Sequence, residues 1–265
     1  MKKIALIGLH VLAVLVLTVF TQVGGIIYLI ALLWPKRLLP ARPPTWLLRM
    51  SFFLSLYLLS SYWIVPQLAP LFGRKPLPND GSLRAHHWHI PLLNRHYAKP
   101  ALHEVLVRAA AKQDLQTYYL DAGFPFWDWF LMFPHLSHGD GNQVDVAFYY
   151  RDPEGKQVKA PPLSGYGYYD GAKPGEVDYS AICTGKGYWQ YDVKAGGKKE
   201  ITEEAQPDHQ ATVQLIRALT AQPRVGKIFL EPHLKARWGL SANAKVRFHG
   251  CQASRHDDHF HLMAY

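Results

Sequence analysis

The chain has 265 residues, which is enough for one catalytic domain and a smaller unit beside it. Its formal net charge of +9 is unevenly distributed. Residues 1–75 contain eight Lys and Arg side chains and no acidic side chain, whereas residues 76–265 contain 21 basic and 20 acidic side chains. A nucleic-acid-binding domain would carry its positive charge on one face of the folded part, so this distribution excludes nucleic acid as the expected partner.

The N-terminal quarter has the composition of a membrane anchor. Residues 4–35 and residues 51–72 contain no Asp, Glu, Lys or Arg. A membrane-spanning helix needs about 20 mostly apolar residues, so the sequence predicts two transmembrane helices within residues 1–75. The first run is much longer than the roughly 7–15 apolar residues of a signal peptide. Residues 21–25 (TQVGG) interrupt it, so we expect a kinked or tilted helix there.

Basic side chains near the spans predict the orientation of the anchor. Short loops that are rich in Lys and Arg stay in the cytoplasm. Residues 36–49, between the spans, contain four such side chains, while the N-terminus contributes Lys2, Lys3 and its amino group. We therefore expect the connecting loop in the cytoplasm and both termini, with the C-terminal domain, on the other side. Arg74 and Lys75 directly follow the second span and favour the opposite orientation.

The remainder of the chain mixes helical and strand patterns. Residues 73–84 are polar and rich in Pro and Gly, and residues 76–100 are expected to link the anchor to a domain of residues 101–265. Strands outnumber helices and follow them in mixed order, which predicts an α+β fold with a central antiparallel sheet. The expected helices cover residues 101–112, 208–223 and 232–239, the expected strands cover residues 116–123, 144–150, 225–230, 245–248 and 259–265, and residues 160–197 are expected to form loops and short strands.

The only two cysteines, Cys183 and Cys251, both lie in the predicted domain. If this domain is outside the cytoplasm, a disulfide between them is permitted. Two buried free thiols are the alternative, and the sequence leaves both open.

Three histidines cluster near the C-terminus, in the segment RHDDHFHLMAY (residues 255–265). Successive side chains of a strand point to opposite faces. His259 and His261 should therefore project from one face, while Phe260 and Leu262 point into a core. Such a pair of imidazoles can share one site, although histidine pairs on strands are also common as surface or packing residues.

A second segment supplies a histidine and a carboxylate. In SHGDGNQVD (residues 137–145), His138 precedes Asp145 by seven residues, and the glycines between them allow a turn that brings the two side chains together. Two imidazoles and one carboxylate are a typical ligand set for a catalytic zinc ion, with the fourth position left for water. A structural zinc site is more often closed by four ligands that include cysteine. We therefore expect one Zn²⁺ per chain.

Together the two segments resemble the LAS group of zinc metallopeptidases, named for lysostaphin, D-Ala-D-Ala metallopeptidases and sonic hedgehog. The group pattern is S-H, six residues, D, and later H-x-H, and PHLSHGDGNQVDVAF with HDDHFHL matches it. The spacing H-x-x-H-x-H is particular to the penicillin-insensitive murein endopeptidases. The stretch ATVQLIRALTAQPRVGKIFLEPHLKARW is also similar to that family. The resemblance covers about residues 115–265, is weakest between residues 151 and 205, and does not include the spans.

The resemblance implies a role for each side chain of the motifs. His138, Asp145 and His261 would be the zinc ligands. His259 would be the general base, and His256 would assist it by hydrogen-bonding the base or by polarising the scissile carbonyl.

Asp258 is the rival candidate for the base. Some D-Ala-D-Ala metallopeptidases place a glutamate three positions before the last ligand, where this chain has Asp258. We favour His259, because strand alternation places it on the face of His261 and directs Asp258 away, towards hydrogen bonds at the end of the strand.

The function implied by the resemblance is a membrane-anchored zinc metalloendopeptidase that hydrolyses peptide bonds in peptidoglycan, with D-Ala–meso-diaminopimelate cross-links as the expected substrate. A D,D-carboxypeptidase of the same group is one alternative. A zinc-binding module of hedgehog type, without catalysis, is another, although such a module has no need of a base. The implied location is the bacterial inner membrane, crossed more than once, with the catalytic domain on the periplasmic side. The sequence indicates no particular protein partner.

Histidines outside the motifs have simpler expected roles. The cluster HHWH (residues 86–89) is expected at the surface, and His135 is expected to line the site or pack beside it. His233 and His249 are expected to be solvated. The Tyr and Trp side chains of residues 166–191 suit the walls of a substrate groove and the core equally well.

Overall fold

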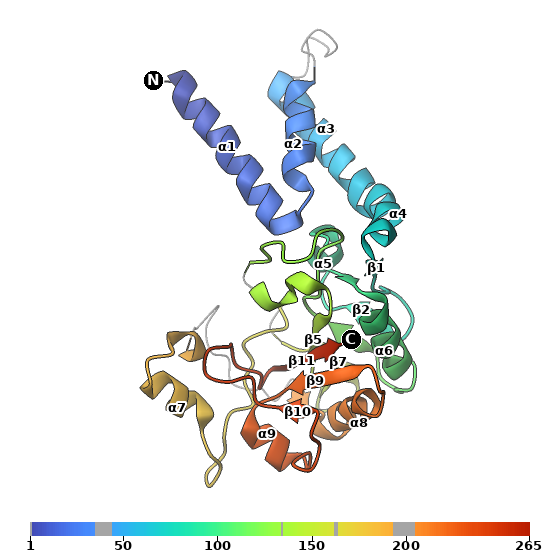
Figure 1. Ribbon diagram of the computed structural model, residues 1–265, viewed down its shortest axis with the longest axis vertical. Helices are drawn as coiled ribbons and strands as arrows, with labels where there is room; N and C mark the ends of the chain where they lie inside the picture. Colours follow the sequence, from blue (N-terminus) through green and yellow to red (C-terminus); the bar gives the residue numbers. More distant parts are fainter. Residues whose placement is uncertain (1, 35–43, 134, 162–163, 193–204) are drawn as a thin grey trace.

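The computed structural model of the chain describes residues 2–34, 44–133, 135–161, 164–192 and 205–265. The helices of the N-terminal quarter stand at one end of a mixed domain of helices and strands (Figure 1). Two of them, Lys3–Thr21 and Thr45–Phe72, are long and apolar enough to cross a membrane. The number of candidate spans therefore agrees with the sequence, whereas their arrangement differs from it.

The first apolar run forms two helices rather than one kinked span. Helix α1 (Lys2–Thr21) ends at Gln22, whose φ is +66°, and α2 (Gly24–Leu33) runs back beside it (Figure 1). The two helices approach closely, because a Cβ atom on Gly25 would lie 1.9 Å from the hydroxyl oxygen of Thr18. The prediction of a kink is wrong because Gln22 adopts a left-handed conformation that reverses the chain, and the absence of a Cβ on Gly24 and Gly25 lets the two helices pack closely there.

The reversal places the N-terminus at the end of the anchor that is remote from the domain (Figure 1). His10 of α1 hydrogen-bonds the Tyr28 hydroxyl of α2 at 2.8 Å, as two antiparallel helices allow. Helix α3 (Thr45–Leu59) begins at the same remote end and continues through a π-helical turn (Ser60–Ile64) and α4 (Val65–Leu68) towards the domain. The N-terminus and the domain therefore lie at opposite ends of the anchor, unlike the expected placement of both termini on one side, because the ten-residue α2 returns the chain to the remote end. Three of the basic residues predicted to orient the connecting loop, Lys36, Arg37 and Arg42, lie outside the described residues.

A six-stranded mixed sheet forms the core of the domain, in the order β10-β9-β11-β5-β4-β2. The pairs β9–β11, β11–β5 and β5–β4 are antiparallel, and the outer pairs β10–β9 and β2–β4 are parallel. The predicted α+β class is confirmed; the sheet is antiparallel only in its four central strands, whereas the prediction was an antiparallel sheet. The strands are β2 (Leu83–Ala85), β4 (Thr117–Tyr119), β5 (Gln143–Ala147), β9 (Val225–Phe229), β10 (Val246–Arg247) and β11 (His259–Ala264).

Strand β2 comes from the segment predicted to be a linker. Leu83 and Ala85 are buried on either side of the exposed Arg84, and β2 pairs with β4 at the edge of the sheet. A strand of three residues is too short to show a clear alternation of apolar and polar side chains, and the surrounding Pro and Gly residues are typical of a linker. The sequence therefore did not predict this strand. Short pairings complete the described sheets: β1 (Lys75–Pro76) with β3 (Tyr97–Ala98), and β6 (Tyr150–Arg151) between β7 (Gln157–Val158) and β8 (Gln206–Pro207).

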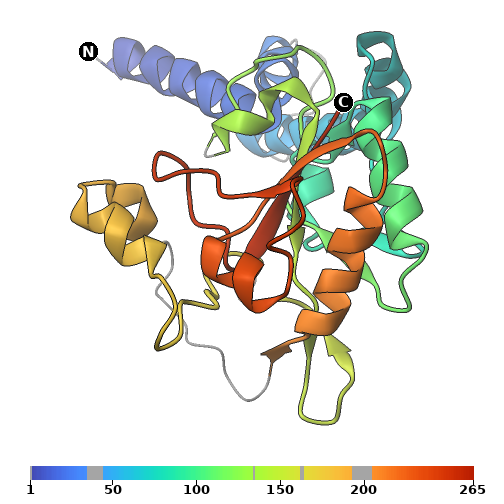
Figure 2. The same ribbon diagram turned by 60° about the horizontal axis from the view of Figure 1, so that its bottom comes forward.

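The two faces of the main sheet have different coverings. Helices α6 (Pro100–Ala110) and α8 (His209–Thr220) lie together on one face, as Figure 2 shows. Their apolar sides share one core with Phe260 of β11, which is fully buried. Because side chains alternate along a strand, His259 and His261 point to the opposite face, which no such pair of helices covers in the described parts of the chain.

Residues 160–197 contain a helix where loops and short strands are predicted. Helix α7 (Tyr179–Gly185) begins after Asp178, whose carboxylate accepts a hydrogen bond from the N–H of Ala181 at 3.0 Å. This N-cap satisfies a backbone donor at the start of the helix. The Gly- and Tyr-rich composition around it favours extended structure, so only the cap residue signals the helix. Two further short helices are α5 (His89–Leu92) and the predicted α9 (Pro232–Arg237).

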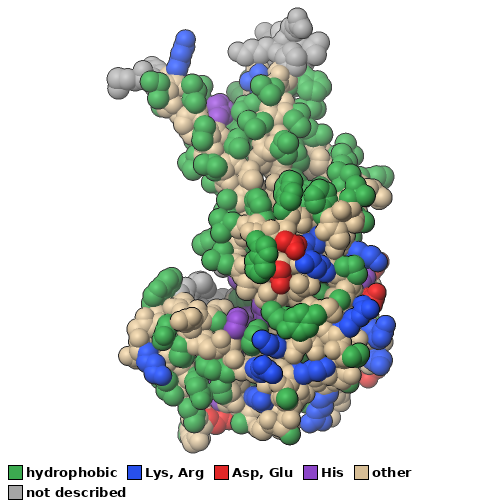
Figure 3. All heavy atoms as spheres, in the orientation of Figure 1, with side chains coloured by type: hydrophobic (Ala, Val, Ile, Leu, Met, Phe, Trp, Pro, Cys, Tyr) green, Lys and Arg blue, Asp and Glu red, His purple; other side chains and the backbone are tan. Residues whose placement is uncertain are grey.

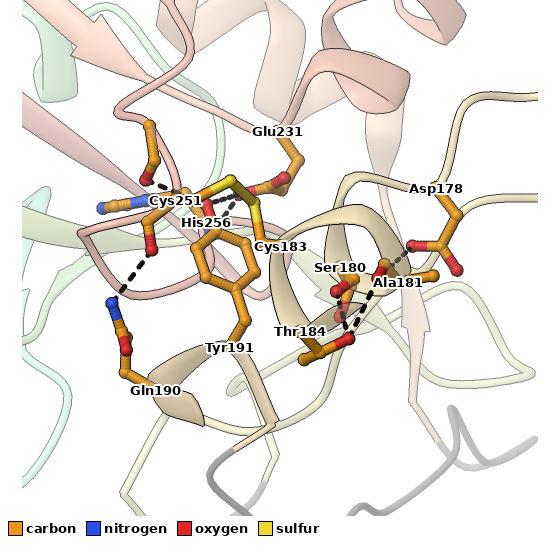
Figure 4. The surroundings of a disulfide bond; sticks show 11 residues. Asp178, Ser180, Ala181, Cys183, Thr184, Gln190, Tyr191, Glu231, Cys251 and His256 are labelled. Carbon is orange, nitrogen blue, oxygen red and sulfur yellow. Dashed lines mark hydrogen bonds between the residues drawn. A yellow bond between two sulfur atoms is a disulfide. The ribbon is translucent and has the colours of Figure 1, made fainter. Parts of the chain in front are cut away.

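A disulfide between Cys183 and Cys251 ties α7 to the segment before β11 (Figure 4). Beside it, the Gln190 side chain donates a hydrogen bond to the Cys251 carbonyl at 2.9 Å, and the Tyr191 hydroxyl donates to the Gly250 carbonyl at 3.2 Å. Of the two alternatives that the sequence leaves open, the structure has the bridge.

We expect both cysteines to be unreactive towards thiol reagents in denatured, unreduced protein and to react fully after reduction. The bridge joins residues 68 positions apart, so replacing both cysteines by serine should lower the free energy of unfolding by about 2–4 kcal/mol. Denaturant unfolding of the parent and the double variant measures this loss. Immediate labelling of both cysteines without reduction would contradict the bridge.

Candidate metal centre and cleft

The open face of the sheet brings the three predicted metal ligands together. Strands β5 and β11 pair so that Asp145 lies directly opposite His261. His138 comes from a 3-10 turn (Leu136–Asp140) just before β5. The turn ends at Gly141, whose φ of +67° returns the chain to the sheet. All three ligand side chains are buried.

The candidate ligand atoms form a compact triangle. Oδ1 of Asp145 lies 2.9 Å from Nδ1 of His261 and 3.3 Å from Nε2 of His138, and the two ring nitrogens are 3.2 Å apart. Bonds of about 2.0–2.1 Å to a tetrahedral zinc ion separate its ligands by about 3.3 Å. The triangle therefore has the size that such an ion requires.

Each imidazole of the triangle is held by its other nitrogen. Nδ1 of His138 lies 2.9 Å from the carbonyl oxygen of Ala122, and Nε2 of His261 lies 2.7 Å from Oε1 of Gln143. These oxygens only accept, so the two nitrogens carry protons when the rings are neutral, and the lone pairs of the other nitrogens face Asp145. Two lone pairs and a carboxylate oxygen that converge on one point suit a cation, and such outer partners are usual for metal-binding histidines.

The electrostatics of the triangle agree with a cation site. Burial raises the pKa of Asp145, but His138 and His259 outweigh burial and hold this pKa well below its usual range. Burial lowers the pKa of His261 to about 4. An ionised carboxylate and a neutral imidazole are the forms that bind metals. Burial also lowers the pKa of His138, but the Asp145 carboxylate outweighs it and leaves this pKa raised; a cation on Asp145 would offset that attraction.

His259 lies beside the triangle and is held by Asp258. Nε2 of His259 is 3.6 Å from Oδ1 of Asp145, while its Nδ1 is 2.5 Å from Oδ1 of Asp258. The other Asp258 oxygen accepts a hydrogen bond from the N–H of Gly167. Burial lowers the pKa of His259, but Asp258 and Asp145 raise it to about 9. The prediction that Asp258 points away is wrong, because it precedes the first residue of β11 and lies outside the strand's alternation.

His256 and His249 extend the row of imidazoles. The His256 ring centroid lies 5.1 Å from that of His259 and 5.2 Å from that of His249, which stacks on Phe229 at 3.9 Å. Burial above all, and then the neighbouring imidazoles, hold the pKa of His256 well below its usual range, so its ring is neutral. The backbone N–H of His256 donates to Glu231 at 3.2 Å (Figure 4).

Several histidines predicted at the surface are not there. His249 is half-buried beside the site, and His233 is buried with its Nε2 2.8 Å from the Asp170 carbonyl oxygen. His86 of the HHWH cluster is buried too, with its Nε2 2.9 Å from the Ala160 carbonyl oxygen. Each of these rings has a partner from a distant part of the chain, which local sequence cannot show.

A second polar group lies next to the ligands. Nδ1 of His135 is 2.7 Å from a carboxylate oxygen of Asp121 and 3.5 Å from one of Asp145. Arg95 makes two hydrogen bonds of 2.6 Å to Asp121. The Tyr166 hydroxyl donates to Oδ2 of Asp145 at 2.8 Å, so this oxygen is fixed while Oδ1 faces the imidazoles. Of these neighbours of the ligands, the sequence indicated His135 and, as a possible groove wall, Tyr166, but neither Asp121 nor Arg95.

This group offers a second way to hold a metal ion. Ligand atoms of His135, His138 and Asp145 lie within 4.8 Å of one another, so they could bind one. The triangle with His261 is tighter, since its longest side is 3.3 Å. His135 is also already bonded to Asp121. The structure therefore offers two candidate ligand sets, of which the one with His261 is the more compact.

The ligands line a cleft of about 480 Å³. One wall consists of His135, Leu136 and Ser137, and the other includes Gln190 and Gln252, next to the disulfide. Figure 3 shows histidine side chains in a hollow between the lobe that contains α7 and the body of the domain. All five predicted site residues line this cleft: His138, Asp145, His256, His259 and His261.

The site is assembled from three segments that are distant in sequence. The turn before β5 carries His138, β5 carries Asp145, and β11 with the residues before it carries His256, His259 and His261. When the chain was compared with known proteins, no family model and no curated protein matched it. The geometry of these segments in this chain is the basis for the roles proposed below.

Proposed function

We propose that this chain is a membrane-anchored zinc metallopeptidase of LAS type that hydrolyses peptide bonds in peptidoglycan. The observation that carries the proposal is the convergence of ligand atoms from His138, Asp145 and His261 at 2.9–3.3 Å in a cleft, with His259 beside them. Three ligands plus an adjacent base are what a hydrolytic zinc site needs. A structural zinc site would usually use a fourth protein ligand.

The side chains divide the chemistry between them. When bound, a zinc ion would polarise the scissile carbonyl and lower the pKa of water to about 7. Asp145 helps to raise the pKa of His259, and a cation in the triangle would offset that attraction and favour the neutral ring. The neutral ring can take the proton of the attacking water at Nε2, because its Nδ1 is already bonded to Asp258. Asp258 stabilises the imidazolium and fixes the plane of the ring. His259 can then deliver the proton to the leaving amine.

His256 is suited to the developing charge on the substrate. Its ring is neutral, lines the cleft and lies 5.1 Å from the ring of His259. Its Nδ1 has no hydrogen-bond partner among the described residues, although it is buried. A buried imidazole nitrogen of this kind can donate a hydrogen bond to the scissile carbonyl oxygen as it becomes negative.

We expect Asp258→Asn to lower kcat/KM by about 10–100-fold while the metal is retained, since an outer partner of a working histidine is lost. An amide in place of the carboxylate no longer stabilises the imidazolium that forms at His259. Steady-state kinetics and elemental analysis of the full chain measure the two effects. The exposed Asp114, on the loop after α6, gives a matched control in Asp114→Asn. Unchanged turnover in Asp258→Asn would show that Asp258 has no part in catalysis.

An endopeptidase and a D,D-carboxypeptidase of this group place similar demands on the cleft. A carboxypeptidase binds the terminal carboxylate of its substrate, which a Lys or Arg side chain recognises well. The described residues that line the cleft include no Lys and no Arg. In a D-Ala–meso-diaminopimelate cross-link, however, the D-centre of diaminopimelate also carries a free carboxylate beside the scissile amide, so the cleft lining does not separate the two activities. We propose the cross-link as the substrate because the spacing of His256, His259 and His261 resembles that of the murein endopeptidases. The His259–Asp258 pair in turn favours catalysis over a purely zinc-binding module.

A direct competition separates the two peptidase activities. The full chain in detergent is given an equimolar mixture of a cross-linked muropeptide dimer and a monomeric pentapeptide. We expect the dimer to be consumed first, without release of terminal D-Ala from the pentapeptide. Preferential release of D-Ala would identify a carboxypeptidase instead.

We also propose that α1 and the helix from α3 to α4 cross the bacterial inner membrane and that the domain is periplasmic. Lys3 and Arg49 lie near the remote end of the anchor, where basic side chains indicate the cytoplasm. Arg74 follows the second span on the domain side, but it is buried and paired with Asp128, so its charge is neutralised within the protein. The disulfide suits an oxidising compartment.

A further inference from the structure

The segment of residues 127–133, here called the aromatic loop, exposes large apolar side chains next to the anchor. Trp127, Trp129, Leu131 and Phe133 are all exposed, and Trp129 is 77% exposed. Single exposed apolar residues are ordinary on a protein surface, but four within seven positions form a patch, and apolar patches mark interaction sites.

The aromatic loop touches both candidate spans at their domain ends. The Phe133 ring packs edge to face against Phe20 near the end of α1, with centroids 6.3 Å apart. The Trp127 ring packs in the same way against Phe72, the last residue of the second span, at 5.8 Å. Figure 1 shows the loop directly beneath the anchor helices, and Figure 3 shows hydrophobic side chains on the helices and on this part of the domain. The exposed patch is therefore continuous with the apolar surface of the spans.

A buried cation fixes the loop at this level. Arg74 follows the second span and is 1% exposed. Its guanidinium donates to the Asp140 carbonyl at 2.6 Å and pairs with the Asp128 carboxylate of the aromatic loop, which Lys99 also contacts at 2.9 Å. Gly141 leaves room for it, since a Cβ atom there would lie 1.2 Å from Nη1 of Arg74. The contacts of Arg74, which directly follows the second span, thus hold the aromatic loop at the level where that span ends.

The backbone at Trp129 is strained. Its φ is +63°, in the left-handed region that bulky residues rarely adopt, and its N–H donates to the Gly139 carbonyl at 2.8 Å. Glycine or asparagine would take this conformation at lower cost. With most of its side chain exposed, the indole gains little packing within the domain. Strain that is retained in this way indicates a role for the side chain outside the domain.

We propose that the aromatic loop lies in the interfacial layer of the lipid bilayer, and this rests on the membrane crossing in the proposed function. Tryptophan concentrates at the headgroup level of membranes, where its ring has both apolar and polar surroundings. We identify the lipid bilayer as the partner of the exposed patch because the patch contacts both spans at their domain ends, where each span would leave the hydrocarbon core of the bilayer. The chain runs on from Phe133 to His135 and Leu136, which line the cleft. The loop therefore holds the cleft next to the membrane surface, and the substrate is a peptide that is held close to that surface.

Quenching of tryptophan fluorescence tests the lipid contact without any need for catalysis. The full chain is reconstituted in phosphatidylcholine–phosphatidylglycerol vesicles whose acyl chains carry bromine near the headgroup, and the quenched fraction of the emission is measured. The test variant is Trp127→Phe combined with Trp129→Phe, which keeps an aromatic ring at each position. The control is Trp189→Phe, on the lobe across the cleft, because Trp189 is 76% exposed and thus matches Trp129.

The two variants should change the quenched fraction in opposite directions. Removing the loop indoles should lower it, because emission near the bromines is lost, and removing Trp189 should raise it, because emission far from the lipid is lost. A quenched fraction that stays the same or rises in the loop variant would overturn the proposal. The loop variant keeps the anchor residues Trp46 and Trp63, so the quenching of its emission reports membrane insertion, and a failure of the anchor is distinguished from a failure of the loop.

Discussion

Replacing His259 by alanine should lower kcat/KM by about 10²–10⁴, the usual contribution of a general base, and should leave the bound metal in place. The ring lies next to the ligand triangle without belonging to it, since its Nε2 is 3.6 Å from Asp145 and its Nδ1 is bound to Asp258. The variant therefore loses proton transfer while His138, Asp145 and His261 remain. Initial rates on a cross-linked muropeptide, together with zinc content by elemental analysis, measure both parts of this prediction.

A control variant outside the cleft and variants of the neighbouring residues test whether the loss is specific to His259. His87→Ala removes a half-exposed imidazole outside the cleft and should leave both rate and zinc unchanged. His256→Ala should give a smaller loss than His259→Ala, because His256 assists the carbonyl rather than the proton transfer. An active His259→Ala, with Asp258→Asn inactive and still zinc-bound, would make Asp258 the base and reverse the two roles.

Loss of a ligand should have the largest effect, because it removes the metal and the activity together. We expect His138→Ala, Asp145→Ala and His261→Ala each to bind less zinc than the one ion per chain of the parent. Their activity should fall by more than the roughly 10–100-fold that follows loss of an outer partner. Zinc titration of the full chain, with turnover measured at each occupancy, checks the prediction. Full zinc retention in all three variants would refute the ligand assignment.

His135→Ala decides between the two possible ligand sets. If the third ligand is His261, this variant should keep its zinc, since His135 is bonded to Asp121. If His135 and not His261 binds the ion, His135→Ala should lose zinc and His261→Ala should keep it. The two variants therefore give opposite results under the two assignments.

Strand periodicity explains why the sequence could locate the site residues. The alternation of β11 places His259 and His261 on one face whatever the strand pairs with, and the short spacing between His138 and Asp145 limits how far apart their side chains can lie. The register that sets Asp145 opposite His261 depends on the pairing of β5 with β11, which are more than a hundred residues apart. The local sequence pattern indicated which side chains could bind a metal. The pairing of the distant strands β5 and β11 decides which of these side chains come together.

Features that depend on a turn or on a distant partner were not predictable from the sequence. Gln22, with its positive φ, reverses the chain where hydropathy shows one continuous apolar run. Asp258 turns towards His259 because the regular strand has not yet begun at that point. Tyr166 hydrogen-bonds Asp145, whereas the sequence suited its side chain equally to a groove wall and to the core. In each case the structure is decided by the conformation of one residue or by a tertiary contact, and neither can be inferred from the hydropathy or composition of the neighbouring sequence.

The most direct measurement is the digestion of isolated murein by the zinc-loaded full chain, followed by separation and mass analysis of the released muropeptides. We predict that cross-linked dimers are converted to uncross-linked monomers with intact glycan. The conversion should stop when zinc is chelated and should be nearly absent in His259→Ala. If zinc-loaded, folded protein leaves the dimers unchanged, or if His259→Ala converts them as fast as the parent chain, the proposed activity is contradicted.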